Sequence, residues 1–158
     1  MSVEPSPDMA ATLNGLHRSR LSWATAMGIT FVRATPDEVV AEIEIGPQHL
    51  QPFGIVHGGV HAGAIETLAS VGATLVAAPR GQAVVGLENH TTFVRAARSG
   101  RMRIVATPVT RGRTTQVWEA TVRDAQERIL ATGRVRLLCV EATSQLAGGS
   151  VELPALDG

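Results

Sequence analysis

Apolar residues form one nearly continuous run in this chain, between residues 60 and 78. The run follows a stretch, residues 51–59, in which Pro52 and Gly54 disfavour regular structure. A helix that is apolar on all sides must be buried. The pattern therefore predicts a buried central helix that begins near Gly58 and continues to Ala78.

Strand-like patterns lie on both sides of this run. Residues 29–34 and 39–45 are expected to pair across a Pro-Asp turn, and four further strands are expected at residues 83–95, 102–109, 114–123 and 128–140. The turns between these four are too short for crossover helices, which predicts antiparallel neighbours. We expect an α+β fold in which a curved antiparallel sheet packs on one long helix.

A chain of 158 residues has the size of one domain. We expect a disordered leader at residues 1–8, a single domain at residues 9–141, and a flexible tail at residues 142–158, where Ser, Gly and Pro are frequent. The composition of residues 9–27 predicts a short helix that ends at Gly28.

Charge and cysteine content exclude several classes of protein. All 14 cationic side chains are arginine, which excludes lysine Schiff-base chemistry and a phosphate-loop lysine. Cys139 is the only cysteine, so neither a disulfide framework nor a cysteine-rich zinc site can form. The first residues lack the pattern of a signal peptide, which predicts a cytoplasmic protein. No block of like charge is present, so nucleic-acid binding is not expected.

The apolar run has two alternative interpretations, a membrane-spanning helix and a metal site. Its length approaches that of a membrane-spanning helix, but His61, Glu66 and several glycines argue against a span. His57 and His61 are four residues apart, yet they lack the intervening glutamate of the zinc-protease motif, and no third ligand follows at a recognisable spacing. We expect neither membrane insertion nor a metal.

Glu66 is the only charged residue in the apolar helix, and a carboxylate in a core is costly unless it is paired or performs chemistry. Gly59, Gly63, Glu66 and Ser70 share one stripe at three- and four-residue spacing, which could form the floor of a pocket. The first backbone N–H groups of the helix, around Gly58, could stabilise an oxyanion. This combination suggests acyl chemistry. The alternative is that the glycines permit close packing and a core hydrogen bond satisfies Glu66.

Three segments resemble a known family. GIVHGGVHAGAIETLAS, VVGLENHTTFVRAARSGRM and GRTTQVWEATV are similar to segments of the hotdog-fold acyl-CoA thioesterases. The likeness is to their glutamate-dependent branch, which includes 4-hydroxybenzoyl-CoA thioesterase of the Arthrobacter type and the 1,4-dihydroxy-2-naphthoyl-CoA thioesterases. It covers residues 23–141 and implies a hotdog fold.

The resemblance implies catalytic roles for five residues. Glu66 matches the family's carboxylate, which acts as nucleophile or as general base on water. Gly58 matches the glycine whose N–H stabilises the thioester oxyanion. Gln51 and His57 match the polar pair that orients the carbonyl or the water, and Ser70 matches the residue that holds the water.

The resemblance also implies how substrate and partner subunits bind. Asn89, His90 and Thr91 lie on the strand that forms part of the pocket from the neighbouring subunit; alternatively, they are polar residues on the sheet surface. Arg113 and Thr114 fall where the family contacts the nucleotide end of coenzyme A. We expect an acyl-CoA substrate, no cofactor, and a homo-oligomer that is a dimer or a dimer of dimers.

Two rival functions remain open, a hotdog hydratase or dehydratase and a non-catalytic acyl-CoA-binding protein. The acyl group is not specified by the sequence. Phe53, Val60, Ala64 and Leu68 are expected to line the pocket, and they suggest an aromatic or medium-chain acyl group.

Overall fold

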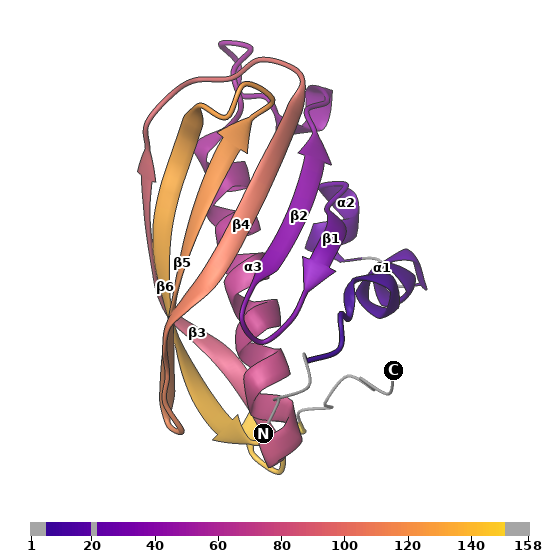
Figure 1. Ribbon diagram of the computed structural model, residues 1–158, viewed down its shortest axis with the longest axis vertical. Coiled ribbons are helices and arrows are strands. Elements are labelled where there is room, and N and C mark those ends of the chain that lie inside the picture. The colour runs from indigo at the N-terminus through magenta and orange to yellow at the C-terminus, as the bar shows by residue number, and fades with distance from the viewer. Residues whose placement is uncertain (1–5, 20–21, 151–158) are drawn as a thin grey trace.

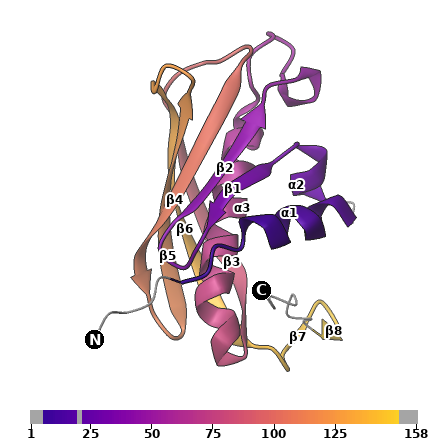
Figure 2. The same ribbon diagram turned by 45° about the vertical axis from the view of Figure 1, so that its right-hand side comes forward.

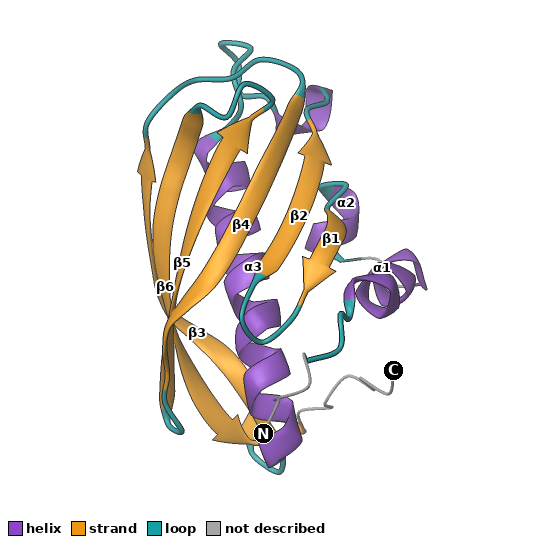
Figure 3. Ribbon diagram, in the orientation of Figure 1, coloured by secondary structure: helices purple, strands orange, loops and turns teal. Residues whose placement is uncertain are grey.

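The computed structural model describes residues 6–19 and 22–150. A six-stranded antiparallel sheet curves around the long helix α3 (Gly58–Ala77), as Figures 1 and 3 show. The short helices α1 (Ala10–Ser19) and α2 (Trp23–Ala26) lie on the side of α3 away from strands β4 to β6 (Figure 2). This is the hotdog fold, and the predicted α+β class is confirmed.

The strands follow the predicted segments closely. Their bounds are β1 Thr30–Ala34, β2 Val39–Glu44, β3 Gln82–Phe93, β4 Arg101–Arg111, β5 Thr115–Asp124 and β6 Ile129–Glu141. The predicted hairpin of β1 and β2 is present, and the hydroxyl of Thr35 accepts hydrogen bonds from the backbone of Asp37 and Glu38 in its turn. The alternation of apolar and polar residues was therefore sufficient to locate the strands.

The order of the strands differs from the expectation that β3 and β4 are neighbours. The order is β1-β2-β4-β5-β6-β3, so β3 pairs with β6 and forms one edge of the sheet. The link at residues 94–100 carries the chain from one side of the sheet to the other (Figure 1). It is fixed to the loop that precedes α3, where the Val56 N–H donates to the Ala97 carbonyl at 2.8 Å. A link of this length can therefore cross the sheet end without a helix.

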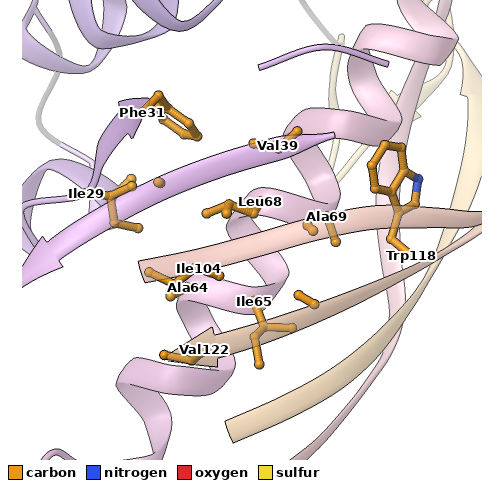
Figure 4. Close-up of a cluster of buried hydrophobic side chains, with 14 of the residues drawn as sticks. Ile29, Phe31, Val39, Ala64, Ile65, Leu68, Ala69, Ile104, Trp118 and Val122 are labelled. Atoms are coloured by element: carbon orange, nitrogen blue, oxygen red, sulfur yellow. The ribbon is translucent and has the colours of Figure 1, made fainter. Parts of the chain in front are cut away.

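The core lies between α3 and the concave face of the sheet. Figure 4 shows Ala64, Ile65, Leu68 and Ala69 of the helix facing side chains of β1, β2, β4 and β5. By length and composition alone the segment Gly58–Arg80 could span a membrane, but 56% of its window is buried inside the fold. The apolar run is therefore the core helix of a globular domain, as predicted.

Both ends of the chain lie partly outside the described residues. Of the expected leader, residues 1–5 are not described, but the Asp8 carboxylate accepts hydrogen bonds from the N–H groups of Ala10 and Ala34. The expected helix within residues 9–27 consists of two, α1 and α2, and Gly28 follows with a positive φ of 62°. Of the expected tail, residues 151–158 are not described, and residues 145–150 form a small hairpin of β7 (Gln145–Leu146) and β8 (Gly149–Ser150).

Candidate active site

The N-terminus of α3 has one free backbone donor. His57 caps the helix, because its Nδ1 accepts from the Gly59 N–H at 2.8 Å and its carbonyl accepts from the Val60 N–H at 2.9 Å. In the described part of the chain, no acceptor pairs with the N–H of Gly58. A free N–H at a helix N-terminus can bind a developing negative charge.

The loop at residues 51–57 is held close to this helix end. Gln51 and Gly54 close a turn in which Gly54 has a φ of 71°, a conformation that favours glycine. The Arg98 guanidinium donates from Nη1 to the carbonyls of Phe53 at 2.9 Å and Gly54 at 3.1 Å. These hydrogen bonds restrict the conformation of the loop, which carries the half-buried Gln51 and leads into the start of α3.

His49 supports the residue that caps α3, and the sequence reasoning did not single it out. Its ring is buried, and Nδ1 accepts from the Gly46 N–H at 2.8 Å, which leaves Nε2 to donate to the Met27 carbonyl at 3.1 Å. Its own carbonyl accepts from the His57 N–H at 2.8 Å. His49 thus connects the end of α2 to the residue that caps α3. No motif in the sequence marks this role, which depends on contacts between distant segments.

Glu66 is exposed in the single chain, and the expectation that it lies in the core is wrong. The amide nitrogen of Asn89 donates to Glu66 Oε2 at 3.3 Å and to the Ala62 carbonyl at 3.0 Å. The hydroxyl of Thr91 donates to Asn89 Oδ1 at 2.7 Å, which turns the amide nitrogen towards the helix. Asn89 and Thr91 therefore hold the Glu66 carboxylate at the surface of α3.

The contact between Asn89 and Glu66 lies within one chain. β3 packs directly beside α3 of the same chain, and the hydrogen bond from Asn89 to Glu66 is made there. That Glu66 faces the Asn89 strand of a neighbouring subunit stays a prediction. His90 is exposed, and strand alternation directs it to the face opposite Asn89 and Thr91. The structure therefore brings Asn89 and Thr91, but not His90, to Glu66.

The stripe of small residues on α3 is only partly open. A Cβ at Gly63 would clash with the ring of Trp23, and a Cβ at Gly59 would lie 2.9 Å from the ring of His57. Close packing thus accounts for these glycines. Ser70 is half-buried on the same side of the helix as Glu66.

The residues expected to line a pocket divide into two groups. Val60, Ala64 and Leu68 are buried in the core, because they lie on the side of α3 that the sheet covers. Phe53 is exposed on the loop before the helix. Only Phe53 of this set could contact a ligand in the single chain.

Arg113 and Thr114 lie at the other end of α3. With Arg80, Gln82 and Glu141 they line an open hollow of about 530 Å³. Neither Arg80 nor Arg113 pairs with an acid in the described part of the chain, whereas the neighbouring Arg111 pairs with Asp37. The structure does not bring Arg113 or Thr114 next to Glu66.

His61 is a buried histidine whose Nδ1 has no hydrogen-bond partner among the described residues. Burial lowers its pKa from the ordinary value of 6.5. The folded chain therefore binds a proton less readily than the unfolded chain. Stability from this group is present above pH 6.5 and is lost as the pH falls through the lower, folded value.

Replacement of His61 by leucine should therefore flatten the fall in stability on acidification. We expect urea midpoints at pH 7.5, 6.5 and 5.5 to fall less steeply in His61→Leu than in the wild type. The exposed His90, changed to Gln, is the control. Parallel curves for the wild type and His61→Leu would contradict the prediction.

Comparison with known proteins agrees with this geometry. Residues 53–131 match the model of the thioesterase superfamily, and a protein of Mycobacterium tuberculosis that carries the name of an esterase is 39% identical over 142 residues. That match covers 89% of this chain and 99% of the relative. The chain belongs to the thioesterase superfamily.

Solved structures place this thioesterase among similar folds. A thioesterase of Haemophilus influenzae is 29% identical with a TM-score of 0.79, over 86% of this chain and 93% of the other. A thioesterase of Pseudomonas aeruginosa is 28% identical with a TM-score of 0.79, over 87% and 96%. The M. tuberculosis protein, with 38% identity in its solved structure, has a TM-score of 0.75 over 78% and 100%. The chain is accordingly a thioester hydrolase.

Proposed function

We propose that this thioesterase hydrolyses an aromatic or medium-chain acyl-CoA to the free acid and coenzyme A, as a cytoplasmic member of the glutamate-dependent branch. The observation that carries the proposal is that α3 carries both groups: a Gly58 N–H at its N-terminus that has no partner in the described part of the chain, and an exposed Glu66 carboxylate two turns further on. The names of the similar proteins support hydrolysis of thioesters. The acyl-CoA substrate and the branch rest on this geometry and on the sequence motif.

The reaction needs only groups of this kind. In the general-base route, Glu66 removes a proton from the water that attacks the thioester carbonyl, and the Gly58 N–H stabilises the oxyanion. Collapse of the tetrahedral intermediate breaks the C–S bond, and the proton held by Glu66 passes to the thiolate, which leaves as the thiol of coenzyme A. In the nucleophilic route, Glu66 attacks the carbonyl itself and the thiolate leaves; water then hydrolyses the acyl-glutamyl anhydride, which gives the free acid, restores the carboxylate and supplies the proton for the thiolate. Asn89, oriented by Thr91, holds the carboxylate. By the resemblance to the family, Gln51 and His57 orient the carbonyl or the water, and Ser70 holds the water.

Helix geometry favours a site that two chains form together. Gly58 and Glu66 are eight residues apart, which corresponds to about 12 Å along the helix axis. An oxyanion donor must lie about 3 Å from the carbonyl oxygen, and a carbonyl bond is only about 1.2 Å long. A thioester carbonyl bound to Gly58 of one chain is therefore too far along the helix axis from Glu66 of the same chain for direct attack. The N-terminus of α3 in one subunit would therefore work with Glu66 of another, in a dimer or a dimer of dimers.

Complementation tests this arrangement. Glu66→Ala removes the carboxylate, and Gly58→Pro removes the N–H, so each homodimer should be inactive. A hybrid dimer has one site with both groups intact if the groups come from different chains. Random reassociation makes half of the dimers hybrids, so an equal mixture should recover about a quarter of wild-type thiol release. Two Glu66→Ala variants with different affinity tags are the control and should recover nothing.

The outcomes separate the alternatives. The Glu66→Ala and Gly58→Pro chains also carry different affinity tags, so that hybrid dimers can be detected. If light scattering and the tags show hybrid dimers but the mixture stays inactive, both groups act within one chain. Wild-type protein that binds acyl-CoA but releases no thiol would favour the binding-protein alternative. Loss or gain of an enoyl double bond without thiol release would favour the hydratase.

Arg113 provides a separate prediction about coenzyme A. If its free guanidinium binds a phosphate of the nucleotide, Arg113→Ala should raise KM about fivefold and leave kcat unchanged, as expected for about 1 kcal/mol of uniform binding. KM of the wild type should also rise with ionic strength. Arg111→Ala, on the same turn but paired with Asp37, is the matched control. Equal KM in both variants would assign Arg113 to a solvated surface.

A further inference from the structure

Phe93 packs directly on the residue that carries the free donor. A Cβ built at Gly58 would lie 2.7 Å from Cζ of Phe93 and within 3.1 Å of two other ring atoms. Since Cβ and the backbone nitrogen of a residue are two bonds apart, the ring lies within about 5 Å of the Gly58 nitrogen. Phe93 is nevertheless 59% exposed, at the end of the edge strand β3.

The ring of Phe93 also lies near a buried polar group. The ring of His61 lies 6.3 Å from that of Phe93, with an angle of 40° between the two planes. His61 is one helical turn from Gly58 and has an Nδ1 without a partner among the described residues. Phe93 thus lies near both the Gly58 N–H and an imidazole whose Nδ1 has no hydrogen-bond partner among the described residues.

Phe93 does not have the environment of a core residue. The chain has five aromatic residues, of which Trp118 and Phe31 are buried. Trp118 also packs on a helix glycine, Gly72, but its ring is fully enclosed by core side chains. Phe93 directs the tip of its ring, Cζ and the two Cε atoms, at Gly58 of the helix and is otherwise largely exposed. The Phe93 side chain therefore contributes less to the free energy of unfolding than the buried Trp118 side chain. The Phe93 ring can also shift without disturbing the core.

We propose that Phe93 is a specificity-determining residue of this thioesterase, whose ring limits the width of the acyl group that can lie beside the Gly58 N–H. The inference rests on the proposed function. A carbonyl oxygen bound about 3 Å from that nitrogen brings the substituents of the carbonyl carbon into contact range of the ring. It does so whether Glu66 comes from the same chain or from a partner, because Gly58 and Phe93 belong to one chain.

Acyl-CoA substrates of different width test this role. The panel contains butanoyl-CoA, benzoyl-CoA and hydroxynaphthoyl-CoA, and the readout is the ratio of kcat/KM for the widest to kcat/KM for the narrowest. This ratio is measured within one preparation, so it does not depend on the fraction of folded enzyme. Phe93→Ala should raise the ratio at least about tenfold, and Phe93→Trp should lower it, since changes of this size in a pocket alter discrimination by about 10- to 200-fold.

A matched control and a second variant make the outcomes decisive. Val109→Ala truncates an apolar side chain of similar exposure on β4 and should leave the ratio unchanged. Phe93→Leu keeps an apolar contact with Gly58 and should give an intermediate ratio, even if Phe93→Ala folds poorly. If the wild type releases thiol but all Phe93 variants have ratios within twofold of the wild-type ratio, the inference is overturned and the proposed function stands. Absence of thiol release by the wild type would overturn both.

Discussion

Glu66→Ala should lower kcat for acyl-CoA hydrolysis by about 10²- to 10⁴-fold, the range for loss of a general base. The physical reason is the isolation of this carboxylate, which is the only ionised side chain on α3 and lies exposed at the surface of the helix. Because Glu66 is exposed and its hydrogen-bond partner among the described residues is Asn89, the melting temperature should change by only a few degrees. Thiol release and a thermal melt on the same preparation measure the two effects.

Conservative variants separate charge from shape. Glu66→Gln keeps the length of the side chain and an oxygen that can accept from Asn89, so it should be nearly as inactive as Glu66→Ala. Glu88→Gln removes an exposed carboxylate one residue before Asn89, where it pairs with Arg136, and should retain wild-type kcat. A folded Glu66→Gln enzyme with near-wild-type turnover would exclude the carboxylate from the chemistry.

The sequence predicted the elements because each has a strong local pattern. The run at residues 60–78 has few polar side chains, so it had to be the buried helix, and the hairpin at residues 29–45 has alternating strands around a Pro-Asp turn. The order of the strands in the sheet was harder to predict from the sequence. The pairing of β3 with β6 depends on contacts between residues about 50 positions apart, such as Val84 and Cys139, and turn length does not encode them.

The exposure of Glu66 could not be read from the helix sequence. Alanine and glycine dominate α3 on all sides, and they do not distinguish the face under the sheet from a face left open to a partner or a substrate. The tightly packed glycines illustrate the same limit. Gly63 and Gly72 look equivalent in sequence, yet one lies under the partly exposed Trp23 and the other under the buried Trp118.

Catalytic candidates were easier to predict than the residues that position them. Glu66 and Gly58 belong to a local motif with fixed spacing. His49 and Arg98 act through hydrogen bonds to backbone groups of other segments, and such bonds place few demands on nearby sequence. The role of Arg98 depends on the contact between the link at residues 94–100 and the loop at residues 51–57, two segments about 40 residues apart in the sequence.

Gly58→Pro should lower kcat by about 10²- to 10³-fold relative to Gly58→Ala, the usual cost of removing one oxyanion donor. Proline suits this position structurally. Gly58 is the first residue of α3, where a helix tolerates proline, and its N–H has no partner in the described part of the chain. His57 has φ −66° and ψ 135°, the extended conformation that a residue before proline prefers.

Alanine is the matched control because it adds the same Cβ and keeps the N–H. That Cβ would lie 2.7 Å from the ring of Phe93 in either variant, and the partly exposed ring can shift to accommodate it. Any loss common to both variants therefore measures the steric effect, and the ratio of their kcat values measures the hydrogen bond. Equal kcat in folded Pro and Ala variants would show that the Gly58 N–H does not bind the oxyanion, and the donor would then have to come from the side chains of Gln51 or His57.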